Sequence, residues 1–137
     1  MTDLEYAKEK LEENTVCLVK ETSLFISQKR GVTPLLEFIE SGFDYRQYSA
    51  ADKIVGKAAA FLYASLGVKE VYAEVLSKGA IPVFEKYNIS FEYHTLADNI
   101  INRKGTGPCP MEEAVSHCSS KEEALLAVYN KVKELQI

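Results

Sequence analysis

Strand patterns and helix patterns alternate along this chain after an initial hairpin, and this alternation constrains the fold more than any other feature. Two runs of β-branched and aromatic residues, Thr15–Lys20 and Leu24–Gln28, are separated by three residues, which is hairpin spacing. Further strand patterns follow at Glu70–Leu76 and Ile89–Leu96. Strands that alternate with helices after a hairpin predict an α/β fold, a three-layer α/β/α sandwich on a mixed sheet.

Helices are predicted from apolar spacing and from start and stop residues. The strongest pattern covers Ser49–Leu66, where seven apolar residues fall in one arc when projected at about 100° per residue. Ser119 and Ser120, followed by Glu122 and Glu123, form overlapping capping boxes for the last helix. The other predicted helices are Met1–Asn14, the segment from Thr33 to Gly42, Ala80–Tyr87 and Pro110–His117.

Length and composition predict one globular domain over residues 1–137. Hydrophobic residues make up 47% of the chain and charged residues 26%, as in ordinary soluble proteins. A net charge of -4 without a basic tract argues against nucleic acid as a partner. No apolar run reaches membrane-spanning length and the N-terminal segment is amphipathic, so we expect a cytoplasmic protein that does not bind membranes.

A loop rich in glycine and proline, Gly105–Glu113, presents a single cysteine at the predicted start of a helix. Free backbone amides at a helix N-terminus favour the thiolate, so Cys109 is a candidate nucleophile, redox-sensitive thiol or sulfur carrier. The alternative is a small, half-buried residue that fills a tight turn. Both interpretations place Cys109 at a rigid loop.

A second candidate group lies at the beginning of the predicted Ser49–Leu66 helix. Lys53 and Lys57 would lie one turn apart, with Asp52 and Gly56 on the adjoining ridge. Two amines near a helix start suit a phosphate or carboxylate, and Gly56 indicates close approach of a backbone or ligand. The alternative is that both lysines are solvated and Asp52 takes part in a capping box.

Glu74 interrupts an apolar strand face between Tyr72 and Leu76. A carboxylate at this position lies either at the end of the sheet or against a cation, and Lys53 or Lys57 is the natural partner. Such a pair either tunes a catalytic pKa or is only structural.

Asn102 and Arg103 directly precede the glycine-rich loop. Together with Lys104 they are candidate ligands for an anion, and a solvated loop end is the alternative interpretation.

The order of elements resembles the cytidine-deaminase-like fold, whose core is a hairpin followed by helix, strand, helix and strand. Three stretches are similar to a domain-of-unknown-function family, DUF1893, which is assigned to this fold: Ala51–Ala59, Val71–Val75, and Ile101–Arg103 through Cys109–Glu112. The resemblance implies the fold and implies no activity.

The ligands of a zinc deaminase are missing from the positions where this resemblance would place them. Such an enzyme has His-x-Glu or Cys-x-Glu at the start of the central helix and Pro-Cys-x-x-Cys at the start of the next. Here these positions read Ala51–Lys53 and Ser77–Ala80, and Cys109 lies one strand later. A helix from Cys109 would also hold the thiols of Cys109 and Cys118 about 13 Å apart, too far for one metal. We expect neither a metal nor a cofactor.

Three functions remain open. The first is binding of a small anionic, nucleotide-like metabolite, with Lys53 or Lys57 holding the anion and Cys109 nearest to any chemistry. The second is an enzyme with Cys109 as nucleophile or sulfur carrier and a lysine or Glu74 as proton partner. The third is a non-catalytic interaction module, in which the small residues Gly56, Ala60 and Ala64 let a helix or another subunit pack closely, as in a homodimer. The candidate catalytic residues are Cys109, Lys53 and Asp52, and the candidate ligand-binding residues are Lys57, Glu74, Asn102 and Arg103.

Overall fold

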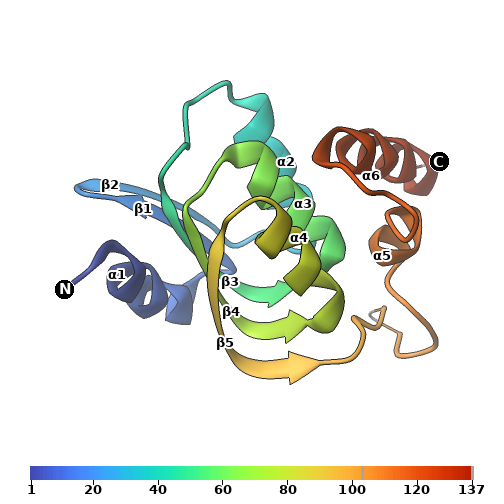
Figure 1. Ribbon diagram of the computed structural model, residues 1–137, viewed down its shortest axis with the longest axis horizontal. Coiled ribbons are helices and arrows are strands. Elements are labelled where there is room, and N and C mark those ends of the chain that lie inside the picture. The colour runs from blue at the N-terminus through green and yellow to red at the C-terminus, as the bar shows by residue number, and fades with distance from the viewer. Residues whose placement is uncertain (103, 137) are drawn as a thin grey trace.

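A mixed five-stranded sheet lies at the centre of the computed structural model, which describes residues 1–102 and 104–136 (Figure 1). The strand order is β2-β1-β3-β4-β5. The first two strands form an antiparallel hairpin, β3 runs antiparallel to β1, and β3, β4 and β5 are parallel to one another. The strands are β1 (Val16–Lys20), β2 (Ser23–Ser27), β3 (Ser49–Val55), β4 (Glu70–Ser77) and β5 (Ser90–Ala97).

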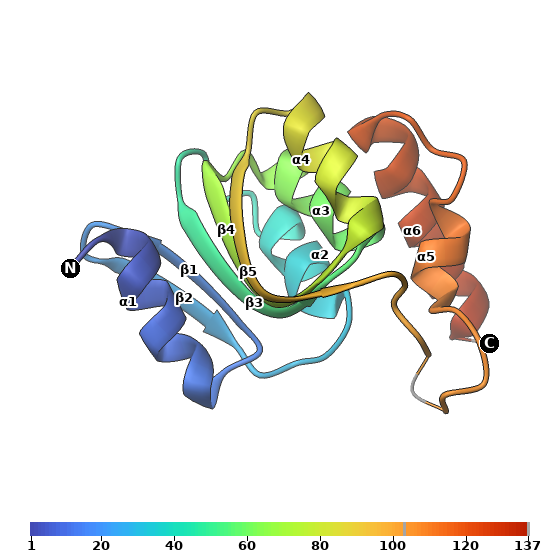
Figure 2. The ribbon, with the colours of Figure 1, turned by 60° about the horizontal axis from the view of Figure 1, so that its bottom comes forward.

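Helices cover both faces of this sheet. Helix α1 lies on one face, and α2, α3 and α4 lie on the other (Figure 2). Helix α6 packs against α3, and the short α5 packs against α6. The bounds are α1 (Asp3–Lys10), α2 (Thr33–Glu40), α3 (Lys57–Leu66), α4 (Ile81–Lys86), α5 (Pro110–Ala114) and α6 (Lys121–Leu135), with 3-10 turns η1 (Leu11–Glu13) and η2 (Lys78–Ala80). The predicted α/β/α sandwich on a mixed sheet is confirmed.

The central strand β3 corrects the prediction of one long helix over Ser49–Leu66. Residues Ser49–Val55 form the strand, Gly56 is the N-cap, and the helix begins at Lys57. Alanine-rich sequences favour helices, but here Ala50 and Ala51 are both fully buried, one toward α3 and the other toward α1. In a strand that is covered on both faces, packing against the covering elements decides which side chains are favourable, and intrinsic helix or strand propensity matters less.

The core is divided by the sheet. The larger part lies between the sheet and helices α2, α3, α4 and α6, and the smaller part lies under α1 around Leu11 and Cys17. Ala60 and Ala64 belong to the larger part and are buried within one chain. The close packing predicted at Gly56, Ala60 and Ala64 is therefore made by the protein's own elements, which leaves these residues covered and not available as a dimer surface. Among the described residues, no helix combines the length and hydrophobicity needed to cross a bilayer.

Candidate functional site

A cleft of about 260 Å³ opens at the carboxyl ends of β4 and β5, beside the start of α3. In α/β sheets, ligands bind outside the carboxyl ends of parallel strands. Charged and polar side chains from several segments line this cleft. The lining residues are Lys57, Ser77, Gly79, Asp98, Asn99, Ile100, Pro108, Glu112 and Ser116.

The first amides of α3 hold the carboxylate of Glu112, which comes from the first turn of α5. The Lys57 N–H donates to Oε1 of Glu112 at 2.7 Å, and the Ala58 N–H donates to Oε2 at 2.9 Å. The N-cap of α3 is a glycine and provides no side-chain cap. A carboxylate on free amides at a helix N-terminus is also stabilised by the helix dipole. Glu112 therefore caps α3 from a distant part of the chain.

Gly56 permits this contact. A Cβ atom at position 56 would collide with the Glu112 carboxylate. A group does approach Gly56 closely, but it is a side chain of the same protein and not the predicted backbone or ligand. Glu112 is missing from the predicted site because no local pattern connects position 112 with position 56. Gly56 was a signal of close approach, but the sequence placed it inside a predicted helix over Ser49–Leu66.

Lys57 lies on the cleft, at the base of α3. Its Nζ donates to the backbone carbonyl of Ser116 at 3.1 Å and lies 6.0 Å from the centre of the Phe61 ring. The ammonium group is thus held near the segment that follows α5. Lys57 is the one predicted site residue that both lines the cleft and belongs to α3.

Asp52 does not line the cleft, contrary to its predicted role as a catalytic residue there. It is buried between β3 and α3, where the Tyr63 hydroxyl donates to Oδ2 at 2.6 Å and the Ile54 N–H donates to Oδ1 at 3.3 Å. Burial raises the pKa of Asp52 to about 7, and these two hydrogen bonds oppose the shift. Burial, followed by the nearby Asp52 charge, also raises the pKa of Tyr63.

Lys53 lies outside the cleft as well. Successive strand residues point to opposite faces of the sheet, so the Lys53 side chain is directed away from that of Asp52. Asp52 points toward α3, whereas Lys53 forms an ion pair with Glu74 at 3.2 Å. The predicted partnership of Glu74 with a lysine is observed, and the partner is Lys53. The predicted helical ridge that grouped Lys53 with Lys57 is wrong, since a strand occupies that segment.

Cys109 is the half-buried N-cap residue of α5, and within the described chain its side chain makes no capping hydrogen bond. Its N–H donates to the Ile100 carbonyl at 3.0 Å. The neighbouring residue Pro108 lines the cleft, whereas Cys109 does not. The thiol is thus placed beside the cleft and not in it.

Asn102 shapes the loop before α5. Its N–H donates to the Gly107 carbonyl at 2.8 Å, and its Oδ1 accepts from the Thr106 N–H at 3.1 Å. A β-bridge between Ile101 and Pro108 closes the same loop. These bonds give Asn102 a structural role. Arg103, the other predicted anion ligand in this segment, lies outside the described residues.

The remaining cysteine of interest, Cys17, is fully buried on β1 under α1. Burial, with a further contribution from the Asp52 charge, raises its pKa to about 11. Within residues 1–102 and 104–136, no three side chains of His, Cys, Asp or Glu come together in a way that could hold a metal ion.

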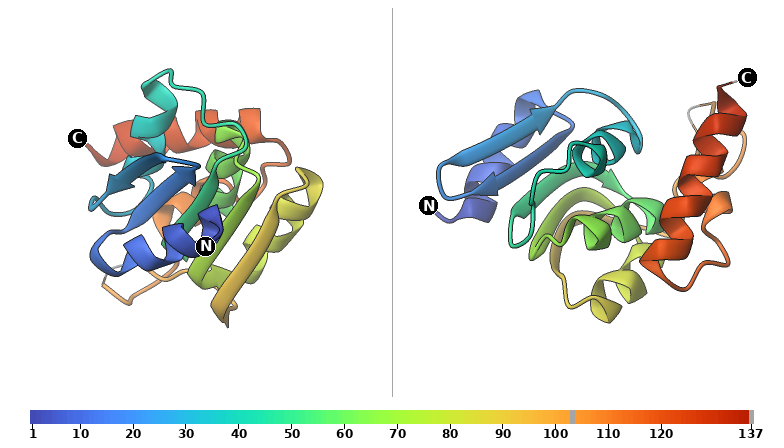
Figure 3. Two further views of the ribbon diagram at one scale, coloured as in Figure 1. Left: turned by 90° about the vertical axis from the view of Figure 1, so that its left-hand side faces the viewer. Right: turned by 90° about the horizontal axis from the view of Figure 1, so that it is seen from above.

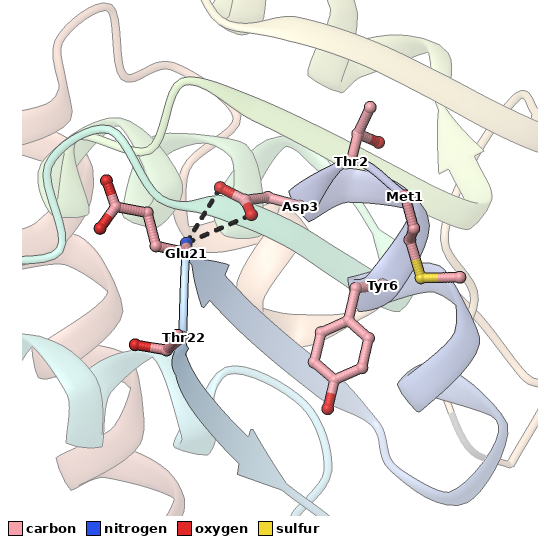
Figure 4. Close-up of a pocket in the computed structure, with 6 residues that line it drawn as sticks. All are labelled: Met1, Thr2, Asp3, Tyr6, Glu21 and Thr22. Carbon is pink, nitrogen blue, oxygen red and sulfur yellow. Dashed lines mark hydrogen bonds between the residues drawn. The ribbon is translucent and has the colours of Figure 1, made fainter.

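A second depression, of about 390 Å³, lies between the start of α1 and the β1–β2 turn (Figure 4). Its internal contact joins the Glu21 N–H to both carboxylate oxygens of Asp3 at 3.2 Å. Its lining, Met1, Thr2, Asp3, Tyr6, Glu21 and Thr22, contains none of the predicted site residues. The cleft beside α3 is therefore the candidate site.

The buried Asp52 carboxyl generates a prediction about pH. Its pKa is about 7 in the folded protein against 3.8 in an unperturbed aspartate, so folding favours the protonated form. Its contribution to the free energy of unfolding is present at low pH and is lost as pH rises from about 4 to about 7. Relative to Asp52→Asn, the wild type should lose about 3 kcal/mol between about pH 4.5 and about pH 8, measured by urea unfolding.

Tyr63→Phe provides the matched control for this pH effect. The Tyr63 hydroxyl donates to the Asp52 carboxylate and lowers its pKa, so removal of the hydroxyl should shift the loss of stability to higher pH. Parallel stability profiles for the wild type and Asp52→Asn would contradict the assignment.

The cap formed by Glu112 generates a second prediction. In Glu112→Gln, one amide of α3 faces a side-chain NH₂ instead of an oxygen, and the favourable charge at the helix start is lost. We expect the free energy of unfolding to fall by about 1–2 kcal/mol. The control is Glu113→Gln, which removes the same charge from an exposed neighbour. Equal stabilities for the two variants would argue against the cap.

Comparisons with known proteins found a matching family and similar solved structures. The DUF1893 family model, a domain of unknown function, matches residues 6–132. A DUF1893 family protein from Thermotoga maritima is 27% identical, with a TM-score of 0.85 over 96% of this chain and 91% of that chain. A diaminohydroxyphosphoribosylaminopyrimidine deaminase/5-amino-6-(5-phosphoribosylamino)uracil reductase from Thermotoga maritima is 14% identical, with a TM-score of 0.43 over 67% of this chain and 34% of that chain. A comparison with curated proteins found no match. Since the family model spans nearly the whole chain, this protein belongs to the DUF1893 family.

Proposed function

We propose that this protein binds a small anionic metabolite in the cleft beside α3. In the proposed complex, the acid group of the ligand takes the place of the Glu112 carboxylate on the amides of Lys57 and Ala58. The observation that carries this proposal is the bidentate contact of Glu112 with those amides, at 2.7 and 2.9 Å. Amides that bind one carboxylate offer the same hydrogen bonds to a carboxylate or phosphate of a ligand.

The local anchoring of α5 is compatible with this exchange. None of its residues, Pro110–Ala114, is buried, whereas Val115 directly after it is fully buried in the core. Glu112 can therefore swing away while Val115 keeps the segment attached to the protein. Gly56 leaves the space above the amides free of a side chain.

The charges of the cleft favour a small acid. The Lys57 ammonium provides a positive charge beside the amides. The negative charge of Asp98 is offset by Lys78, whose Nζ lies 2.7 Å from Oδ1 of Asp98. A volume of about 260 Å³ is small for a ligand site and suits a small carboxylate, a sugar phosphate or part of a mononucleotide.

Covalent chemistry at Cys109 is not part of this proposal, because Cys109 does not line the cleft. Asp52 and Lys53 are likewise directed elsewhere, toward Tyr63 and Glu74. Binding is therefore assigned to the backbone of α3 and to Lys57.

The proposal predicts how Glu112 affects anion binding. Without the competing carboxylate, Glu112→Gln should bind inorganic phosphate or a small carboxylate at least tenfold more tightly than the wild type, about 1.4 kcal/mol. Isothermal titration and melting-temperature shifts measure this, and the ligand should also raise the melting temperature of the variant.

Two further variants test the same site. Glu113→Gln should bind anions like the wild type, because this exposed residue does not line the cleft. Lys57→Gln, introduced together with Glu112→Gln, should abolish the gain in affinity. The proposal is excluded if phosphate, small carboxylates and mononucleotides leave the melting temperatures of the wild type and Glu112→Gln unchanged.

A further inference from the structure

The edge strand β2 lacks two of the features that often protect the edge of a sheet, charged residues and proline. It is the outer strand beside β1 in the described sheet, and its sequence, Ser23–Ser27, contains no charged residue and no proline. Ile26 on this strand has half of its surface exposed. The opposite edge strand, β5, instead carries Glu92, which pairs with Lys8 of α1. The two edges of the sheet are thus not equivalent.

We infer that two copies of this chain associate through β2, antiparallel to each other about a two-fold axis at Phe25. The Ser27 carbonyl accepts from the Thr15 N–H at 2.8 Å, so the backbone groups of Ser27 face the hairpin partner. Because these groups alternate along a strand, those of Leu24 and Ile26 face the free edge. In the inferred register, Leu24 of each copy pairs with Ile26 of the other.

The side chains in this register are apolar on both faces of the sheet. On the face that carries α1, Leu24 and Ile26 become cross-strand neighbours. On the other face, the two copies of Phe25 meet at the axis. Phe43 lies 4.9 Å from Phe25, measured between ring centroids, and has 48% of its surface exposed. Association would therefore cover exposed apolar surface on both sides of the new strand pair.

The charges around β2 are complementary in the same register. Between Glu21 and Lys29 the sequence contains no other charged residue, and these two lie at equal distances from Phe25. Glu21 lies in the turn before β2 and Lys29 lies two residues after it, so antiparallel pairing about Phe25 brings the Glu21 end of each copy near the Lys29 end of the other. Lys29 contacts Glu37 at 2.5 Å and keeps 60% of its side chain exposed. Opposite charges at the two ends of an uncharged strand select an antiparallel second copy.

This surface is separate from the candidate cleft. The β1–β2 hairpin and α6 lie at opposite ends of the molecule in the right-hand view of Figure 3. The cleft lies beside the start of α3 and the segment that leads to α6. The association therefore does not depend on the proposed function of the cleft.

Sedimentation velocity over a range of protein concentrations tests the association. We expect the wild type to form a dimer and Ile26→Lys, a change at a half-exposed residue, to be a monomer at the same concentrations. Because dimerisation stabilises the folded state, the melting temperature of the wild type should rise with protein concentration and that of Ile26→Lys should not. The matched control is Leu126→Lys on α6, which changes a similarly exposed residue and should remain dimeric. A wild type that is monomeric at every concentration, or a dimer lost only in Leu126→Lys, overturns the inference.

A cross-linking experiment tests the register. Ser23 of one copy should lie opposite Ser27 of the other, in a pair without mutual hydrogen bonds, where the Cα separation permits a disulfide. Mild oxidation of Ser23→Cys mixed with Ser27→Cys should give a disulfide-linked heterodimer. Each variant alone should show only the background of the wild-type cysteines. Equal cross-linking in the mixture and in the separate variants contradicts the register.

Discussion

The contact between Glu112 and the first turn of α3 is the interaction on which the site depends. Helix α3 lies in the middle of the core, with seven of its ten residues buried, and its N-cap glycine cannot cap it. Unsatisfied amides at the start of such a helix would be costly, and the Glu112 carboxylate satisfies two of them. This contact also fixes α5 over the end of the sheet and so defines one wall of the cleft. The Glu112 carboxylate therefore affects both the stability of α3 and the shape of the cleft.

Much of the fold was predictable because most elements have local signals. The hairpin, β4 and β5 follow strand patterns, and the Ser120 side chain accepts from the Glu123 N–H, as the predicted capping box requires. The strand β3 was not predicted. Small residues such as alanine fit in β3 because α1 packs on one face of this strand and α3 on the other. This packing is visible only in the folded protein. Gly56 marks the true boundary between strand and helix.

The location of the candidate site was predictable from the sequence, but most of the residues that form it were not. Lys57 and Gly56 were expected within a helix over Ser49–Leu66, in a pocket where that helix and the Cys109 loop meet, and the structure brings the start of α3 and this loop together. Asp52 and Lys53 were grouped with Lys57 because a helical period was applied to a strand, where a period of two directs them to opposite faces. Glu112 is separated from Lys57 by 55 residues, and no pattern within one element connects them. Long-range contacts of this kind require the tertiary fold.

The separation of Lys57 and Glu112 also bears on the order in which the chain acquires its structure. Every strand of the sheet and the whole of α3 precede residue 98, whereas the residue that caps α3 comes later, at position 112. The contact between Lys57 and Glu112 closes a loop of 55 residues, and this closure costs more conformational entropy than the short loop of the hairpin does. During synthesis, α3 and the sheet emerge before Glu112, so any packing of α3 at that stage leaves its first amides exposed to water. The last quarter of the chain then supplies both its cap and, through α6, its outer cover.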